Sequence, residues 1–201
     1  MEKETSNNEQ RHTIVLSDSI ITTSTDDSPW YAIRLFTPRQ QAIGEYFENC
    51  NLETFIPMQY VDFEDRQGQR KRELRPVVRN LIFVKKTISH AQMTALMQQS
   101  PFKMSVRKES RDSCEYYEIP SRQMREFRLM CNPEIEMRQY LSENEAKLKT
   151  GTQVNVVFGP LKGLTGKLVR QSHKYYLLKE IPGIAVMLKV SRWCCKAAMS
   201  R

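Results

Sequence analysis

A glycine-punctuated loop between two apolar runs places the tightest constraint on how the end of this chain can fold. Residues 159–169 read GPLKGLTGKLV, and they follow the β-branched run VNVVF at residues 154–158. Gly159 and Gly163 allow the positive φ angles of a tight loop, and Gly166 lets another chain segment approach closely as the next strand begins. The segment therefore predicts a strand–loop–strand unit and excludes a helix.

Further short runs of strand composition fill the rest of the C-terminal quarter, with turn-forming glycine and proline residues between them. The expected strands are 154–158, 166–170, 175–179, 184–189 and 191–195. Five short strands within about 50 residues are typical of a small barrel. The sequence thus predicts an SH3-like β-barrel over residues 150–201.

The preceding block alternates strand and helix patterns. WYAIRLF at residues 30–36 has strand composition, and Thr37-Pro38 predicts the start of a helix over the apolar face that follows. The continuous apolar run LIFV at residues 81–84 indicates a central buried strand. Ser89, with Gln92 three residues later, predicts a capped second helix. Residues 29–132 are therefore expected to form an α+β domain, with helices against a mostly antiparallel sheet.

Two polar segments flank this block. Residues 1–28 are rich in Ser, Thr, Asn and Asp and are predicted to be a disordered leader. Residues 133–149 carry few large apolar side chains and are predicted to be a linker. Its polarity favours independent motion of the two domains, but the sequence does not decide whether they pack together.

The net charge of +8 is distributed unevenly. Residues 147–201 carry an excess of +10, and residues 66–86 hold eight bases against the single acid Glu73. Such patches favour a polyanionic partner, most simply a nucleic acid, although a solvated surface that maintains solubility explains them too. The candidate nucleic-acid contacts are Arg70, Lys71 and Arg72 at a hairpin tip and Lys162, Lys167, Arg170 and Lys174 in the barrel.

Composition and motif searches argue against several other classes. No apolar run approaches the ~18 residues of a membrane helix, and the polar N-terminus does not resemble a secretory signal. Five cysteines without a C-x-x-C and three scattered histidines predict neither a disulfide scaffold nor a metal site. No phosphate-loop, nucleophile-elbow or zinc-protease motif is present. We therefore expect a cytoplasmic, monomeric protein without catalytic residues, cofactor, metal or membrane contact. The adjacent residues Cys194 and Cys195 could form a redox switch. However, successive side chains of a strand point to opposite faces, which favours one buried and one exposed thiol.

The segment 154–169 resembles the KOW motif of NusG-type elongation factors and several ribosomal proteins. The N-terminal block resembles the NusG N-terminal (NGN) domain in the order of Trp30-Tyr31, a proline-started helix, Phe55-Ile56-Pro57 and the run RNLIFV at 79–84. In the family this last element is commonly Pro-Gly/Asn-Tyr-x-Phe-Val, so Arg79 and Leu81 depart from it. The spacing in residues 55–86 and the polar leader are most similar to specialised paralogues that regulate surface or capsular polysaccharide operons.

The resemblance implies a mechanism and a set of contact residues. NGN domains bind the clamp helices of the largest RNA polymerase subunit and raise processivity, whereas KOW domains recruit the termination factor Rho or a small-subunit ribosomal protein. The implied polymerase contacts are Trp30, Tyr31, Arg34, Phe55, Pro57, Val78, Asn80, Phe83 and His90. The implied partner-binding loop comprises Gly159, Pro160, Leu161, Gly163 and Leu164. For Trp30 and Phe83 a core position is favoured over a polymerase contact, because aromatic side chains on strands are commonly buried.

These observations together predict a non-catalytic transcription elongation or antitermination factor, specific to a polysaccharide operon. Arg70, Lys71 and Arg72 of the hairpin would contact upstream DNA or another phosphate backbone, and the basic barrel would contact nascent RNA or an acidic partner. The alternative is a KOW-type ribosome-associated protein or an RNA-binding regulator, which the barrel alone would permit.

Overall fold

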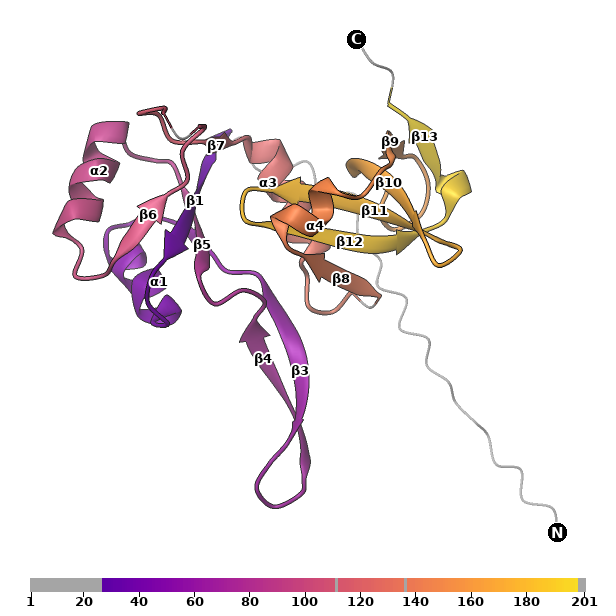
Figure 1. The fold of residues 1–201 in the computed structure, drawn as a ribbon, viewed down its shortest axis with the longest axis horizontal. Coiled ribbons are helices and arrows are strands. Elements are labelled where there is room, and N and C mark those ends of the chain that lie inside the picture. The colour runs from indigo at the N-terminus through magenta and orange to yellow at the C-terminus, as the bar shows by residue number, and fades with distance from the viewer. Residues whose placement is uncertain (1–26, 111, 136, 199–201) are drawn as a thin grey trace.

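The computed structural model describes residues 27–110, 112–135 and 137–198 (Figure 1). The predicted leader, except for its last two residues, lies outside the described part. The fold is mixed α+β, as expected, with helices packed on antiparallel sheets.

The N-terminal sheet follows the order β2-β5-β1-β6, and β7 also pairs with β1. Its strands are β1 (Trp30–Leu35), β2 (Thr54–Phe55), β5 (Leu81–Lys85), β6 (Met104–Val106) and β7 (Glu118–Ile119). The apolar run predicted as a central strand is β5, and it pairs antiparallel with β1 so that Ala32 lies opposite Phe83. This confirms the antiparallel sheet expected from the alternating patterns.

Helices α1 (Gln40–Asn49) and α2 (His90–Gln99) belong to the same region. The capping box at α2 is confirmed: Ser89 Oγ accepts from the Gln92 backbone N–H, and the Gln92 side chain accepts from the Ser89 backbone N–H. The predicted cap of α1 is wrong. The helix begins at Gln40, after Arg39, and no side chain caps it. The Thr37 hydroxyl accepts a bond from the Arg39 N–H ahead of the helix.

Between β2 and β5 the chain forms a separate two-stranded sheet from β3 (Met58–Glu64) and β4 (Arg70–Pro76). This hairpin projects away from both larger sheets (Figure 1). Gly68 in its turn has φ of +75°, as the predicted tip at residues 67–69 requires.

The C-terminal sheet differs from the expected barrel. Its six strands follow the open order β13-β9-β10-β11-β12-β8. The strands are β8 (Arg138–Leu141), β9 (Thr152–Val156), β10 (Thr165–Gln171), β11 (Lys174–Ile181), β12 (Ile184–Val190) and β13 (Cys195–Ala197). No pairing joins β13 to β8 or β12 among the described residues, so the hydrogen-bonded ring of an SH3-like barrel is not closed.

Two differences from the predicted strands explain the open sheet. The segment 133–149, predicted as a linker, contains β8 and the short helix α4 (Glu143–Lys147). β8 extends the sheet at β12, because Tyr140 and Leu141 each pack against a core cluster. The strand predicted at 191–195 is instead the 3-10 helix η2 (Arg192–Cys194) followed by β13.

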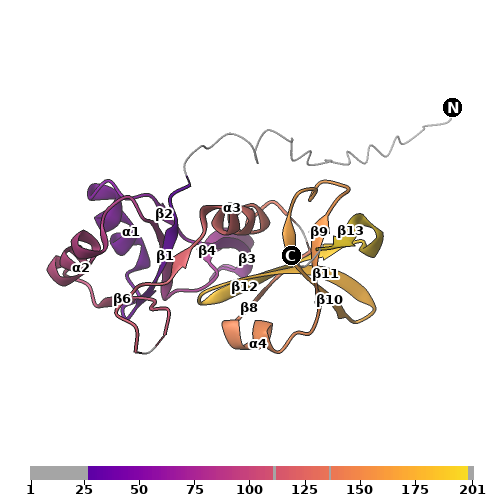
Figure 2. The same cartoon turned by 90° about the horizontal axis from the view of Figure 1, so that it is seen from above.

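Helix α3 (Ser121–Met130) lies between the two large sheets (Figure 2). One core cluster lies on the outer face of the N-terminal sheet with α1 and α2, and includes Tyr31 and Ile33. A second cluster lies between the C-terminal sheet and α4. The largest cluster joins both sheets through α3, so the two regions share one core.

Candidate functional site

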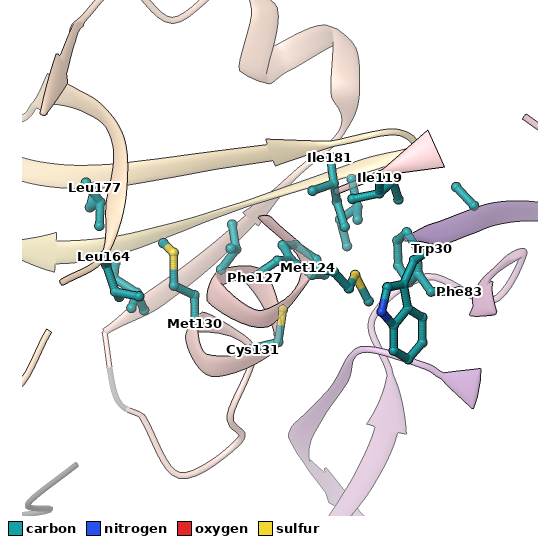
Figure 3. Close-up of a cluster of buried hydrophobic side chains, with 14 of the residues drawn as sticks. Trp30, Phe83, Ile119, Met124, Phe127, Met130, Cys131, Leu164, Leu177 and Ile181 are labelled. Atoms are coloured by element: carbon teal, nitrogen blue, oxygen red, sulfur yellow. The ribbon is translucent and has the colours of Figure 1, made fainter. Parts of the chain in front are cut away.

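The shared core fixes which surfaces of the N-terminal sheet remain accessible. Trp30 and Phe83, from β1 and β5, pack in one cluster with Phe127 of α3 (Figure 3). Leu164, in the loop just before β10, and Leu177 of β11 belong to the same cluster. Phe83 and Phe127 have ring centroids 5.8 Å apart in an edge-on arrangement. A face of the N-terminal sheet that could have been a docking surface is therefore occupied by this chain's own helix and second sheet.

A buried ion pair crosses the same boundary. Glu126 of α3 accepts from Lys179 Nζ of β11 at 2.6 Å and from the Thr165 hydroxyl of β10 at 2.6 Å. Glu126 and Lys179 are 6% and 9% exposed. Burial by itself raises the pKa of Glu126, but the bonds from Lys179 and Thr165 outweigh it and hold the pKa below its ordinary value. Glu126 is thus an anion at neutral pH and its charge is compensated across the boundary.

Arg128 at the end of α3 reaches back to the N-terminal sheet. Its guanidinium lies 5.3 Å from the ring centroids of both Trp30 and Phe55 and pairs with Glu53 at 2.7 Å. Burial by itself raises the pKa of Glu53, but the hydrogen bonds and charges of Arg128 and Lys85 outweigh it, so the pKa lies below its ordinary value. Arg128 of α3 therefore covers two of the predicted polymerase contacts, Trp30 and Phe55.

The structure does not bring the nine predicted polymerase contacts to one exposed face. Trp30, Tyr31, Pro57 and Phe83 are buried. Phe55 and Val78 are half-buried against the shared core. The exposed members are Arg34, Asn80 and His90. For Trp30 and Phe83, the core interpretation weighed from the sequence describes their positions.

Arg34 and Asn80 line the same cleft, of about 370 Å³, between the N-terminal sheet and the β11–β12 turn with α4. Gly183 at this turn lies against Leu81: a Cβ built on it would lie 3.1 Å from the leucine methyls. Glu143 of α4 pairs with Arg107 at 2.8 Å on the cleft wall. His90 lies elsewhere, at the first position of α2, with its ring stacked on Tyr116 at a centroid distance of 4.2 Å.

The glycine-punctuated loop has the expected backbone. Gly163 has φ of +92°, and a Cβ on Gly166 would lie 2.6 Å from the Leu178 carbonyl oxygen, so both positions require glycine. Gly159, Pro160 and Gly163 are exposed. Leu161 is half-buried, and Leu164 is 3% exposed in the shared core. Of the two leucines predicted to bind a partner, only Leu161 retains accessible surface.

The three hairpin cations are all exposed, on the side of the molecule that projects into solvent (Figure 1). Lys71 pairs with Asp65 at 2.7 Å. Arg72 lies 3.8 Å from Asp62 and 4.5 Å from the Tyr60 ring centroid. Both cations are exposed, and ion pairs at the surface hold a side chain weakly, so the cations can exchange these partners for phosphates.

The four predicted C-terminal cations differ in burial and in ion pairing. Lys167 is half-buried, pairs with Glu180 at 2.8 Å and donates to the Lys149 carbonyl oxygen. Lys162, Arg170 and Lys174 are exposed. The sequence could not distinguish Lys167 from the other three, because its partner lies on the adjacent strand.

Two exposed aromatic residues were missed by the sequence analysis. Phe158 follows β9 and Trp193 lies in η2, and they are 63% and 76% exposed. Their ring centroids lie 6.3 Å apart. Both residues lie in segments that were predicted to be strands, in which aromatic side chains are ordinarily buried. Nothing in the sequence therefore indicated that these two rings are exposed.

The cysteines give no sign of a reactive site. Burial raises the pKa of Cys131 to about 12, so its thiol stays protonated. Cys194 and Cys195 are both half-buried, unlike the expected buried and exposed pair, and burial raises the pKa of Cys195. Within the described ranges, no three His, Cys, Asp or Glu residues are grouped to hold a metal ion. Of the helices described, none has the length and apolar character that crossing a membrane requires.

Comparison with known proteins identifies the N-terminal region. Residues 28–128, half of the chain, match the family described as Transcription termination factor nusG. No curated protein matches the chain. The matched span runs from the start of β1 to near the end of α3 and leaves out the C-terminal sheet.

Proposed function

Since this chain belongs to the NusG family of transcription factors, we propose that it is a non-catalytic elongation and antitermination factor that binds RNA polymerase through residues 29–132. The family match over β1 to α3 is the observation that carries the proposal. The proposed site on the polymerase is the clamp of the largest subunit. Binding would favour the closed clamp only through a higher affinity for that state.

The accessible candidates define how the contact would form. Arg34 and Asn80 are exposed at one cleft and His90 at the start of α2, which provides two separate points of contact. Phe55 and Val78 add half-buried apolar surface. Trp30, Tyr31, Pro57 and Phe83 would act indirectly, by holding the sheet that presents the exposed groups.

The remaining parts of the proposal concern the nucleic acids and the second partner. The exposed cations Arg70, Lys71 and Arg72 suit upstream DNA, as phosphate contacts without base readout. In the C-terminal region, the exposed loop around Leu161 suits recruitment of Rho or a small-subunit ribosomal protein. We propose that the protein acts as a monomer.

The proposed specificity is a single class of operon, for surface or capsular polysaccharide. It is supported by Arg79 and Leu81, which depart from the family pattern, and by the +10 charge of residues 147–201. A general factor must act at every gene, so specialised recruitment would use features that a general factor lacks.

In vitro transcription with the cognate polymerase tests the proposal, using terminator templates with and without the leader of the regulated operon. Read-through confined to the native leader supports an operon-specific antiterminator. Read-through on every template would instead indicate a general elongation factor. No effect on either template, with RNA still bound, would support the alternative of a KOW-type ribosome-associated or RNA-binding regulator.

Variants separate contact from stability in the same experiment. We expect Arg34→Ala and Asn80→Ala to weaken polymerase binding without changing the free energy of unfolding, because both side chains are exposed. Lys103→Ala, another exposed residue of the N-terminal region, is the matched control. Unchanged polymerase binding by the Arg34 and Asn80 variants would contradict the assignment of the cleft.

A further inference from the structure

Phe158 and Trp193 form an exposed aromatic pair that the shared core does not explain. A backbone bond from Val157 N–H to the Cys194 carbonyl, 2.8 Å long, joins the two segments that carry them. Their positions are therefore fixed by hydrogen bonding of the fold rather than by burial of the rings. Single exposed apolar residues are ordinary, but two adjacent large rings left 63% and 76% exposed need a reason.

Two arginines lie near a third ring, that of Tyr175, and one of them is the chain neighbour of Trp193. Arg192 precedes Trp193 in η2, and its guanidinium lies 5.9 Å from the Tyr175 ring centroid. Arg170 of β10 lies at the same distance, 5.9 Å, from the same ring. Neither arginine is ion-paired to an acid in the described part of the chain. We call these five residues, Phe158, Trp193, Arg192, Tyr175 and Arg170, the aromatic strip.

The surrounding charge selects the kind of partner. Glu180 is the single acid in residues 147–201 of the sequence, and it is engaged with Lys167. In the ladder of β10 with β11, Lys167 lies opposite Leu178, whereas Arg170 lies opposite Tyr175, three positions further along. The strip is thus a set of rings with two arginines that form no ion pair with an acid of the described residues. A purely apolar protein surface would leave these cations without partners.

We propose that the aromatic strip is a stacking platform for single-stranded RNA. Unpaired bases expose their faces and stack on aromatic side chains, while guanidinium groups neutralise the adjacent phosphates. A duplex hides those faces, so the platform discriminates against it. The choice of RNA over DNA rests on the proposed function, since the strand that leaves a transcribing polymerase unpaired is its transcript. The strip adds base contacts to the lysine contacts expected from charge alone.

Binding of a fluorescently labelled 12-nucleotide single-stranded RNA to the full chain tests the platform, with anisotropy as the readout. We expect Phe158→Ala and Trp193→Ala each to weaken binding about fivefold or more, as truncation of a stacking residue does. The matched control is Phe36→Ala, because Phe36 is also exposed, at 60%, and also has an arginine, Arg34, 5.5 Å from its ring. Thermal melts should be unchanged for all three, since each ring is mostly solvated.

A second readout separates stacking from charge. The chain has two tryptophans, and Trp30 is 3% exposed, so quenching of tryptophan fluorescence by RNA reports on Trp193. Trp193→Phe should abolish this quenching yet retain most of the affinity. Arg170→Ala with Arg192→Ala should lower the slope of log affinity against log salt by about 0.7 for each lost phosphate contact. The two aromatic-to-alanine variants should leave that slope unchanged.

Several results would overturn the platform: wild-type affinity in the Phe158→Ala/Trp193→Ala double variant, an equal loss in Phe36→Ala, or equal binding of the matching duplex RNA. Equal binding of single-stranded DNA would overturn the assignment to RNA. The assay contains no polymerase, so its failure alongside intact antitermination removes only the platform. Intact RNA binding without any effect on transcription removes only the proposed function.

Discussion

The β3–β4 and β11–β12 hairpins have nearly the same length and opposite environments. β11 and β12 have neighbours at both edges, β10 and β8, and their side chains enter two core clusters. β3 and β4 pair only with each other in the described structure, and β4 is exposed over its first five residues. The β11–β12 hairpin therefore holds the fold together, whereas the β3–β4 hairpin has its cations available for a partner.

The comparison also shows what keeps an isolated hairpin in place. Arg72 lies over Tyr60 and Arg75 over Phe63, at 4.5 and 4.8 Å from the ring centroids. Each such contact contributes only about 0.5–1 kcal/mol at an exposed site. A two-stranded sheet held this weakly is marginal by itself, so its conformation depends on its attachment to the core near Val77 and Val78.

The largest expected difference between the hairpins is in the cost of removing the same side chain. Leu177 of β11 is fully buried, so Leu177→Ala should lower the free energy of unfolding by about 4 kcal/mol. Leu74 of β4 is 41% exposed, and Leu74→Ala should cost less than about 1 kcal/mol. Urea denaturation of both variants measures the change in the free energy of unfolding. Similar losses in the two variants would show that the two hairpins contribute equally to the core.

The next effect is the loss of an ion-pair partner. Glu126→Gln leaves the Lys179 ammonium buried and uncompensated, and we expect a loss of about 3 kcal/mol. Asp62→Asn breaks an exposed pair with Arg72 on the hairpin and should change stability by less than about 1 kcal/mol. Replacing both members of the buried pair, in Glu126→Leu with Lys179→Met, should recover much of the first loss. A double variant no more stable than Glu126→Gln would argue against the ion-pair explanation.

Acid should weaken the shared core through the same residue. The pKa of Glu126 in the folded state lies below the ordinary value of 4.5, so its stabilising contribution is complete above that value and is lost as the pH falls through the folded pKa. The unfolding midpoint of the wild type should then decline more steeply below pH 4.5 than that of the Glu126→Leu/Lys179→Met variant. Parallel declines from pH 7 to pH 3 would assign the acid sensitivity to other carboxylates, such as Glu53 and Glu143.

Removing the three cations of the β3–β4 hairpin should have the smallest effect on stability and a large effect on function. Neutralising the hairpin with Arg70→Gln, Lys71→Gln and Arg72→Gln should shift the melting temperature by less than about 4 °C, because only exposed contacts are lost. The same variant should reduce antitermination and the salt dependence of binding to upstream DNA. Retained activity with unchanged DNA affinity would show that the exposed cations serve solubility.

Local sequence patterns predicted much of the fold but not which side chains are buried. The β1 and β5 strands, the α2 capping box and the hairpin turn follow from composition and spacing within a few residues. The polymerase candidates were chosen by motif position, which does not reveal which face of a strand meets another element. Four of the nine predicted polymerase contacts have buried side chains, which motif position did not indicate. β8 was missed because four residues with polar neighbours carry too weak a pattern.

By itself the sequence determined the features that depend on neighbouring residues: the positive φ at Gly163, the close approach at Gly166 and the α+β character of the chain. Only the tertiary structure decided that the two sheets share a core, that β8 leaves the C-terminal sheet open and that Phe158 and Trp193 remain in solvent. The physical reason is the range of the contacts. Glu126 and Lys179 are 53 positions apart, and no local periodicity encodes a partner at that separation. Burial of such pairs is fixed by how the elements pack.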